Sequence, residues 1–358
     1  MFDNIYKGKK VLITGITGFK GSWLKLLLEK LGAKVIGYAL EPNTNPNMFN
    51  IINDNENTIY GDIRDEKKLT NEFNKFNPDI IFHLAAQPLV RKSYKYPKET
   101  YETNVIGTLN VYEAARKCNN LKAIVSITTD KCYENKEWEY GYREIDPMGG
   151  YDPYSSSKGC VEILSASYRR SFLEEEGILL ATARAGNVIG GGDWAEDRLI
   201  PDFVRAVIKE KEIVIRNPLA TRPWQHVLEP LCGYLTLGAE LLKGNKEFTG
   251  GWNFGPNDSD ILSVSDVLDR CIDVFGKGSY VLDKNSQPHE AMLLKLDISK
   301  AKNRLKWNPV YDVDTAINKT ISWYKKYYES KIDMKEYSIN QIKEYINEAK
   351  RLGIKWSV

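Results

Sequence analysis

Histidine and cysteine are scarce in this sequence, which has three histidines and five cysteines among its 358 residues. The cysteines are scattered, and no CxxC pair brings two of them together. A zinc site would need ligands that converge from distant segments, so we expect no metal. Scattered cysteines without paired spacing are typical of reduced and mostly buried thiols.

Long apolar runs and an excess of one charge are also missing. Apolar runs such as Ile178–Ala183 are too short to cross a bilayer, and Met1–Lys10 has no apolar signal-peptide core. The formal net charge is only +2, which creates no long-range field for nucleic acid or an anionic membrane. We therefore expect a cytoplasmic protein without a nucleic-acid or membrane partner, in which local groups hold any anionic ligand.

The first half of the chain alternates β-rich runs with helical patterns. The expected strands are Lys10–Thr14, Lys34–Leu40, Thr58–Tyr60, Asp79–His83, Ala123–Thr128 and Leu179–Arg184. The expected helices are Gly21–Leu31, Glu66–Phe76, Tyr101–Cys118 and Tyr154–Phe172. This alternation predicts the α/β class, with a Rossmann-type, doubly wound parallel sheet covered by helices on both faces.

After about residue 190 the pattern loosens. Helices are expected at Leu199–Lys209, Leu228–Leu242, Ser263–Phe275, Ile298–Leu305 and Val313–Tyr328, with short strands at Ile213–Arg216 and Gly251–Gly255. Ser263 is a plausible N-cap, with Asp266 three residues on. We predict a dinucleotide-binding domain with the catalytic residues over 1–186, a smaller mixed α/β lobe that interleaves with it over 187–330, and a helical tail over 331–358.

A glycine-rich segment follows the first strand and opens the first helix. Its GxxGxxG spacing lets the backbone turn tightly and approach a pyrophosphate, and the helix N-terminus supplies free N–H groups to the phosphates. Three glycines alone also occur in ordinary turns, but the strand–turn–helix context favours a dinucleotide site. The predicted contacts are Gly15, Thr17, Gly18, Phe19, Lys20 and Gly21.

The identity of the dinucleotide depends on the end of the second strand. Ala39 stands where an acidic residue is usual, and no arginine is there to pair with a 2′-phosphate. On balance this pattern favours NAD over NADP. Further cofactor contacts are expected just after the third and fourth strands, at Asp62, Ile63, Leu84, Ala85 and Ala86.

Tyr154 and Lys158 lie four residues apart, which places both side chains on one face of a helix. A phenol with an ordinary pKa of about 10 is a poor base at neutral pH. We expect the ammonium of Lys158 to stabilise the phenolate and to lower the pKa of Tyr154. The pair can then remove a hydroxyl proton while a nicotinamide takes hydride from the same carbon. A solvated pair on a helix surface is the alternative.

The fifth strand ends in a polar turn, Thr128–Lys131. A threonine hydroxyl there, such as that of Thr129, can bridge a substrate and Tyr154. Asp130 and Lys131 place two titratable groups on the expected rim of the active site. Without the neighbouring motifs, an exposed turn with two solvated charges would be the simpler interpretation.

Several motifs together resemble one enzyme family. They are Gly15–Trp23 (GITGFKGSW), Phe82–Arg91 (FHLAAQPLVR), Thr129–Tyr133 (TDKCY), Asp146–Lys158 (DPMGGYDPYSSSK), Ala183–Pro201 (ARAGNVIGGGDWAEDRLIP), Arg222–Pro230 (RPWQHVLEP), Trp252–Asn257 (WNFGPN) and Pro288–Glu290 (PHE). Over about residues 8–328 the chain resembles the extended short-chain dehydrogenase/reductase family, and within it the CDP-glucose 4,6-dehydratases. Each motif is widespread among nucleotide-sugar enzymes, but their joint run is specific to the dehydratase branch.

The resemblance implies CDP-glucose as substrate, a 4-keto-6-deoxy sugar as product, and NAD that stays bound through the turnover. Tyr154 would deprotonate the sugar O4, and Asp130 would be the acid for the departing water. Lys131 stands where thymidine-linked dehydratases carry glutamate. It could act as a base if neutral, or stabilise an enolate-like charge. The base for C5 therefore stays open between Lys131, Tyr133, Tyr151 and a residue not yet placed.

The resemblance also implies a set of substrate contacts. Arg198 and Arg222 are candidates for the diphosphate, because guanidinium groups form paired hydrogen bonds with phosphate oxygens. The strand Ile213–Arg216 is similar to the edge that lies along the nucleoside. The full set is Gln87, Asn187, Arg198, Leu199, Arg216, Arg222 and His289.

Two other functions compete with a dehydratase. An NAD-dependent nucleotide-sugar 4-epimerase would use Tyr154 and Lys158 but would not need the acid and base of Thr129–Lys131. A non-catalytic dinucleotide-sensing protein is a more remote alternative, because such proteins usually lose the tyrosine or the lysine. Family members commonly pair through two long helices, here Tyr101–Cys118 and Tyr154–Phe172, so we expect a homodimer or homotetramer.

Overall fold

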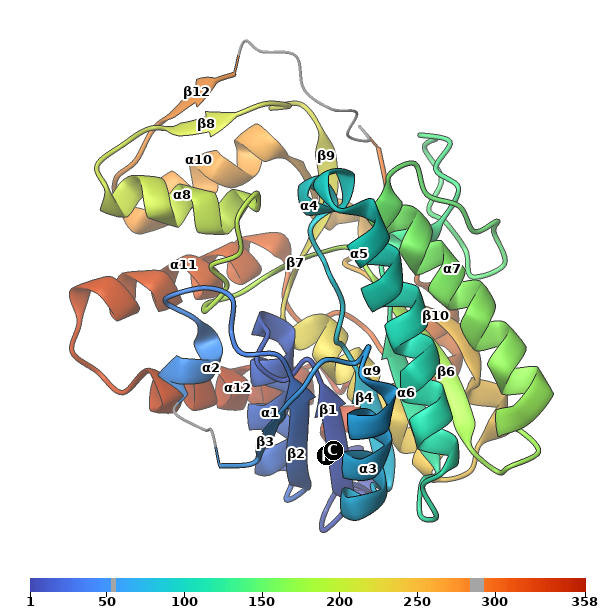
Figure 1. Cartoon of the computed structure of the whole chain (residues 1–358). Coiled ribbons are helices and arrows are strands. Elements are labelled where there is room, and N and C mark those ends of the chain that lie inside the picture. The colour runs from blue at the N-terminus through green and yellow to red at the C-terminus, as the bar shows by residue number, and fades with distance from the viewer. Residues whose placement is uncertain (53–55, 284–292) are drawn as a thin grey trace.

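The computed structural model describes residues 1–52, 56–283 and 293–358. Within them a seven-stranded sheet has the order β10-β6-β5-β4-β1-β2-β3, and each neighbouring pair is parallel (Figure 1). Its strands are β1 (Lys10–Thr14), β2 (Lys34–Ala39), β3 (Thr58–Tyr60), β4 (Ile80–His83), β5 (Ala123–Ile127), β6 (Leu179–Ala185) and β10 (Gly250–Phe254). The strand order reverses at β1, which confirms the predicted doubly wound α/β fold.

Helices cover both faces of this sheet. They include α1 (Phe19–Lys30), α3 (Glu66–Phe76), α6 (Gly107–Arg116), α7 (Pro153–Tyr168) and α9 (Leu228–Leu242). Val11 and Ile13 of β1 belong to one apolar layer, whereas Leu12 between them belongs to the other. This alternation follows the two-residue repeat of a strand and allows each face to bury its own helices.

The remaining half builds a lobe over the carboxyl ends of the central strands (Figure 1). It holds a three-stranded sheet of β7 (Asn187–Ile189), β9 (Thr221–His226) and β11 (Ile261–Ser263), and a pair of β8 (Ile213–Ile215) and β12 (Tyr280–Leu282). Its helices are α8 (Leu199–Ile208), α10 (Val264–Phe275) and α11 (Val313–Glu329), whereas α12 (Met334–Arg351) packs against α11 and, through Tyr345, against α9. Ser263 and Asp266 form a capping box at α10, which confirms the predicted N-cap.

Most expected helices and strands match the observed ones to within two residues, but several short elements were not predicted. These are α2 (Met48–Ile51), α4 (Val90–Lys95), α5 (Pro97–Tyr101), β7, β9, β11 and β12. β9 contains Pro223 and lacks apolar alternation, so only its pairing with β7 and β11 makes it a strand. The expected helix Tyr101–Cys118 begins earlier, since α5 runs into it through a π-helical turn, Glu102–Ile106.

The C-terminal segment is part of the folded core. Tyr345 of α12 donates its hydroxyl hydrogen bond to Oε2 of Glu229 at 2.8 Å. The backbone N–H groups of Val310 and Tyr311 donate to the same buried carboxylate at 3.0 and 2.8 Å. Burial raises the pKa of Glu229 to about 7. The tail is therefore fastened to α9 through one buried acid. Across the described ranges, no helix has the length and apolar character of a membrane span.

Replacing Tyr345 by phenylalanine should lower the free energy of unfolding by about 1–3 kcal/mol, because a buried carboxylate would lose one of its donors. Chemical denaturation of the two proteins measures this difference. Tyr327→Phe on α11 is the matched control, since it removes a hydroxyl that is not directed at Glu229, and it should change stability by less than about 0.5 kcal/mol. Equal losses in both variants would contradict the fastening role.

Candidate active site

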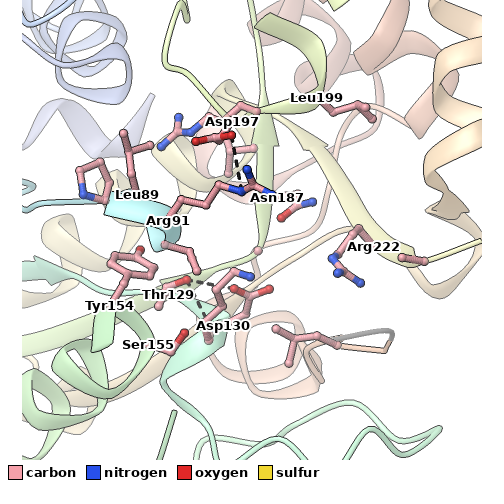
Figure 2. Close-up of a pocket in the computed structure, with 18 of the residues that line it drawn as sticks. Leu89, Arg91, Thr129, Asp130, Tyr154, Ser155, Asn187, Asp197, Leu199 and Arg222 are labelled. Atoms are coloured by element: carbon pink, nitrogen blue, oxygen red, sulfur yellow. Dashed lines mark hydrogen bonds and ion pairs between the residues drawn. The ribbon is translucent and has the colours of Figure 1, made fainter. Parts of the chain in front are cut away.

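A cavity of about 460 Å³ lies between the carboxyl ends of the central strands and the lobe (Figure 2). Residues from both parts line it: Lys20, Thr129, Asp130, Lys131, Tyr154, Asn187, Arg198, Leu199, Arg216 and Arg222. Figure 2 shows Thr129, Asp130 and Tyr154 close together on one side, with Arg91 and Asp197 across from them. The structure thus brings most of the residues predicted for chemistry and substrate binding into one cavity.

Tyr154 enters the cavity from the first turn of α7. Asp152 caps this helix by accepting a hydrogen bond from the Ser155 N–H at 3.0 Å, and Pro153 occupies the first helical position. Tyr154 is only 8% exposed. Burial raises the pKa of its phenol to about 12, while the neighbouring Thr129 side chain and the charge of Arg198 act to lower it.

The sequence predicted a lowered pKa for Tyr154, but the structure raises it, because burial outweighs the groups that favour the phenolate. The Lys158 ammonium donates to the carbonyl oxygen of Ile127 at 3.1 Å, at the end of β5. Burial lowers the pKa of Lys158 to about 8, against the opposing charge of Glu162. The lysine is therefore anchored to the sheet, and burial has the larger effect on the phenol one turn before it.

The turn after β5 holds the other reactive groups. Thr129 caps a short 3₁₀ turn, Asp130–Cys132, by accepting from the Lys131 N–H, and its hydroxyl donates to Asp130 Oδ1 at 3.0 Å. Asp130 is 2% exposed, and burial raises the pKa of its carboxyl against the charges of Lys131 and Arg222. A raised pKa keeps the proton on a carboxyl to higher pH, which is the state that a general acid needs. Lys131 lines the same cavity.

The glycine loop leaves room only for backbone. A Cβ on Gly15, whose φ is +74°, would lie 2.8 Å from the backbone nitrogen of Ala85, and one on Gly21 would lie 2.3 Å from the carbonyl oxygen of Gly15. Gly18 is the N-cap of α1 and carries no side-chain cap, so the first N–H groups of that helix face outward for a ligand. This cradle fits a dinucleotide pyrophosphate.

The side chains of the glycine loop point in different directions. The Thr17 hydroxyl donates to the Leu40 carbonyl oxygen at 2.9 Å and ties the loop to the end of β2. Lys20 instead lines the reaction cavity, where burial first and the charge of Arg198 second lower its pKa to about 8. Phe19 lies against Gly190, where an added Cβ would approach its ring to 3.0 Å. Lys20 thus belongs as much to the reaction cavity as to the phosphate loop.

Some predicted contacts are engaged within the protein. The carboxylate of Asp62 forms an ion pair with Arg64 at 2.6 Å. Ile63 is buried in the core beside Gly107. The side chain of Gln87 donates to the Thr100 hydroxyl at 3.0 Å and accepts from the Leu89 N–H at 2.7 Å, so it shapes the turn before α4 rather than lining the cavity.

The other predicted contacts lie as follows. Leu84, Ala85 and Ala86 follow β4, and the Ala85 N–H donates to the Thr14 hydroxyl at 3.3 Å. Arg198 is the N-cap of α8 and pairs with Asp193 at 2.7 Å. Arg222 of β9 is buried and donates to the Thr221 carbonyl oxygen. His289 lies outside the described residues.

Among the charged cavity residues that sequence reasoning missed, Arg91 and Asp197 form an ion pair across the opening. Asp197 pairs with Arg216 at 3.2 Å and with Arg91 at 3.6 Å, so it joins α4 to the end of β8 across the opening (Figure 2). Arg91 ends the motif FHLAAQPLVR, which was the available signal. Asp197, whose φ is +59°, carries no such signal, because its role depends on two distant elements meeting.

Comparisons with known proteins place this arrangement among nucleotide-sugar enzymes. Residues 12–237 match the family model described as GDP-mannose 4,6 dehydratase. The chain is 48% identical over 356 residues to the CDP-glucose 4,6-dehydratase of Salmonella typhimurium, covering 97% of this chain and 99% of that protein.

Solved structures show the same fold at low identity. The dTDP-glucose 4,6-dehydratase of Streptomyces venezuelae with NAD bound has a TM-score of 0.76 at 23% identity, covering 88% of this chain and 97% of that one. The UDP-glucose 4-epimerase of Thermotoga maritima has a TM-score of 0.77 at 22% identity, covering 89% and 100%. Fold similarity alone therefore does not separate dehydratases from epimerases.

Proposed function

The chain belongs to the nucleotide-sugar 4,6-dehydratase family, and from this premise we propose that it converts CDP-glucose to CDP-4-keto-6-deoxyglucose with NAD as its cofactor. The observation that carries the proposal is the meeting of Tyr154, Asp130 and Lys131 in one cavity. An epimerase needs the tyrosine but has no use for a buried acid and a lysine beside it. The cytidine nucleotide is supported by the 48% identity to a CDP-glucose 4,6-dehydratase.

The glycine loop and the first turn of α1 would hold the cofactor pyrophosphate, and Lys158 would face the nicotinamide end. When bound, NAD supplies an acceptor for the C4 hydride and later the donor that delivers it to C6. Tyr154 removes the O4 proton, and the neighbouring Thr129 side chain and the charge of Arg198 favour its phenolate. Asp130, which burial keeps protonated to higher pH, donates its proton to the departing C6 hydroxyl.

Water loss also needs a base that removes the C5 proton, and the same group can return a proton to C5 when hydride adds to C6. Tyr133 is unsuited, because its buried hydroxyl donates to Asn253 at 2.8 Å and burial raises its pKa strongly. Lys131 and Tyr151 both line the cavity. We favour Lys131, since it directly follows the acid and shares its rigid turn.

Lys131→Met should therefore leave C4 oxidation in place and lower the exchange of the C5 proton with solvent by about 100-fold or more. Deuterium incorporation at C5, followed by mass spectrometry in heavy water, measures this. Lys136→Met is the matched control, since it removes a lysine that is 61% exposed and paired with Glu134. Undiminished C5 exchange would remove Lys131 as the base and leave Tyr151 as the next candidate.

Substrate identity can be tested in one incubation. Each nucleotide-glucose of a panel is mixed with the enzyme and NAD, and the products are read by mass and by the identity of the sugar. Loss of one water from CDP-glucose, with the alkaline chromophore of a 4-keto sugar, is the expected result. A galactose-type product without water loss would establish the epimerase instead. No change in any nucleotide-glucose would favour a dinucleotide-sensing protein.

We further propose a homodimer or a homotetramer built on it, paired through the helices α6 and α7. Ile106, just before α6, is 49% exposed and Ile163 of α7 is 62% exposed, which is unusual for large apolar side chains on packed helices.

A cytoplasmic location is supported by Cys160, whose exposed thiol is free.

A further inference from the structure

A buried ion pair lies beneath the cavity and does not line it. The Arg184 Nη2 atom of β6 is 2.7 Å from Glu162 Oε2 of α7, and the two side chains are 5% and 4% exposed. Burying two charges is costly unless their remaining hydrogen-bonding atoms are also satisfied. Glu162 lies one helical turn after Lys158 and two turns after Tyr154, so this pair sits directly under the reacting residues.

The carboxylate of Glu162 joins three elements. The Thr128 hydroxyl donates to its Oε1 atom at 2.5 Å, and the Thr182 hydroxyl of β6 donates to its Oε2 atom at 2.7 Å. Thr128 directly precedes Thr129, so the turn with the reactive groups starts from this contact. The end of β5 is thus clamped to α7 and β6 at one acid.

Arg184 holds the other end of the same turn. Its Nη1 atom donates to the Tyr133 hydroxyl at 2.5 Å, and its guanidinium lies 4.9 Å from the centre of that ring. The Tyr133 hydroxyl donates in turn to Asn253 of β10 at 2.8 Å. Residues 128 and 133 are therefore both anchored on the ion pair, and Asp130 and Lys131 lie between the two anchors.

The charge of Glu162 also acts on Lys158. Within the described residues, the other titratable groups that interact with this lysine are Cys132 from the turn, His83 from β4 and Lys20 from α1. Burial raises the pKa of the Cys132 thiol and lowers that of His83 to about 3, so both are neutral near pH 7. Glu162 is then the negative charge that opposes the burial of the ammonium, although Arg184 offsets part of it.

We propose that Glu162 is a positioning residue for the reaction: it clamps the turn that carries Asp130 and Lys131, and it balances the charge of Lys158 from one helical turn away. This inference rests on the function proposed above. A merely structural ion pair would affect folding alone. A positioning residue must also change how the catalytic pair responds to pH.

Glu162→Gln is the test. We expect kcat to fall about 30-fold, with KM for the sugar nucleotide within about twofold, because Glu162 does not line the cavity. Without the carboxylate, the pKa of Lys158 falls further, so its positive charge is lost at lower pH. The alkaline limb of kcat, and the pH above which NADH affinity weakens, should both move down by about one pH unit. NADH affinity is measured by fluorescence titration without sugar.

Three further variants keep the test decisive. Glu174→Gln is the matched control, since it removes a carboxylate paired with Arg169 near the end of the same helix. It should change neither the alkaline limb of kcat nor the pH above which NADH affinity weakens. Glu162→Asp keeps the charge but shortens the side chain. The pH dependences of kcat and of NADH affinity should therefore stay unchanged while kcat falls. Glu162→Gln with Arg184→Met removes both buried charges, which avoids an unpaired arginine if the single variant does not fold. In this double variant, the pH dependences of kcat and of NADH affinity should still move to lower pH.

The proposal would be overturned if the pH dependences of kcat and of NADH affinity did not shift in a folded Glu162→Gln protein or in the folded double variant. A Glu162→Gln enzyme with unchanged kcat would also overturn it. A wild-type protein that forms no keto sugar from any nucleotide-glucose would instead refute the proposed function. The NADH titration would still report the effect of Glu162 on Lys158 in that case, so the two failures are distinguishable.

Discussion

Tyr154→Phe should lower kcat by about 10³-fold, because it removes the group that takes the O4 proton and leaves the rest of the cavity intact. This loss corresponds to about 4 kcal/mol of transition-state stabilisation. The substitution deletes one buried oxygen and keeps the ring, so the free energy of unfolding should change by no more than about 1.5 kcal/mol. The pKa of Tyr154, raised to about 12 by burial, implies that substrate and cofactor binding must favour the phenolate.

The measurement is the rate of keto-sugar formation from CDP-glucose at saturating substrate, with thermal unfolding on the same sample. Tyr96→Phe is the matched control, since Tyr96 is 43% exposed, lies beside α4 and does not line the cavity. Its kcat should stay within about twofold of the wild-type value. Turnover in Tyr154→Phe at more than about a tenth of the wild-type rate would show that another group takes the O4 proton.

The position of Tyr154 was among the features that could be predicted from the sequence. Its spacing from Lys158 has one geometric meaning on a helix, and the fifth strand before it places that helix beside the sheet edge where ligands bind. The same reasoning placed the glycine loop, since strand, turn and helix follow one another within a short segment. Local patterns of this kind need no knowledge of distant residues.

Features that depend on distant residues could not be predicted in this way. Gln87 stands in a motif that suggested substrate binding, yet its amide is engaged by Thr100 and Leu89. No role was predicted for Glu162 from the sequence, because a glutamate on a helix is usually solvated. Its meaning appears only when β6 brings Arg184 against it. The effect of burial on the pKa of Tyr154 was missed for the same reason, since burial is a property of the packed protein.

Asp130→Asn should separate the two halves of the proposed reaction. Tyr154 and Lys158 stay in place, so oxidation at C4 should proceed, whereas loss of the C6 hydroxyl should slow by about 10²–10³-fold without its acid. Reduced cofactor should then accumulate on the enzyme, and its fluorescence reports the arrest. Asp146→Asn is the matched control, because its carboxylate accepts from the Arg143 N–H and does not line the cavity.

The pH dependence supplies an independent check on the same residue. Burial raises the pKa of Asp130, so its proton is retained to higher pH and the step it assists should fade only as pH rises through that raised value. An asparagine does not titrate, so the part of the alkaline decline that Asp130 causes should vanish from the residual rate of water loss, while the part that Lys158 causes should remain. If Asp130→Asn instead forms product at the wild-type rate with the same profile, the proton for the departing water comes from elsewhere in the cavity. Lys131 would then be the first group to substitute, since it shares the turn and lines the same space.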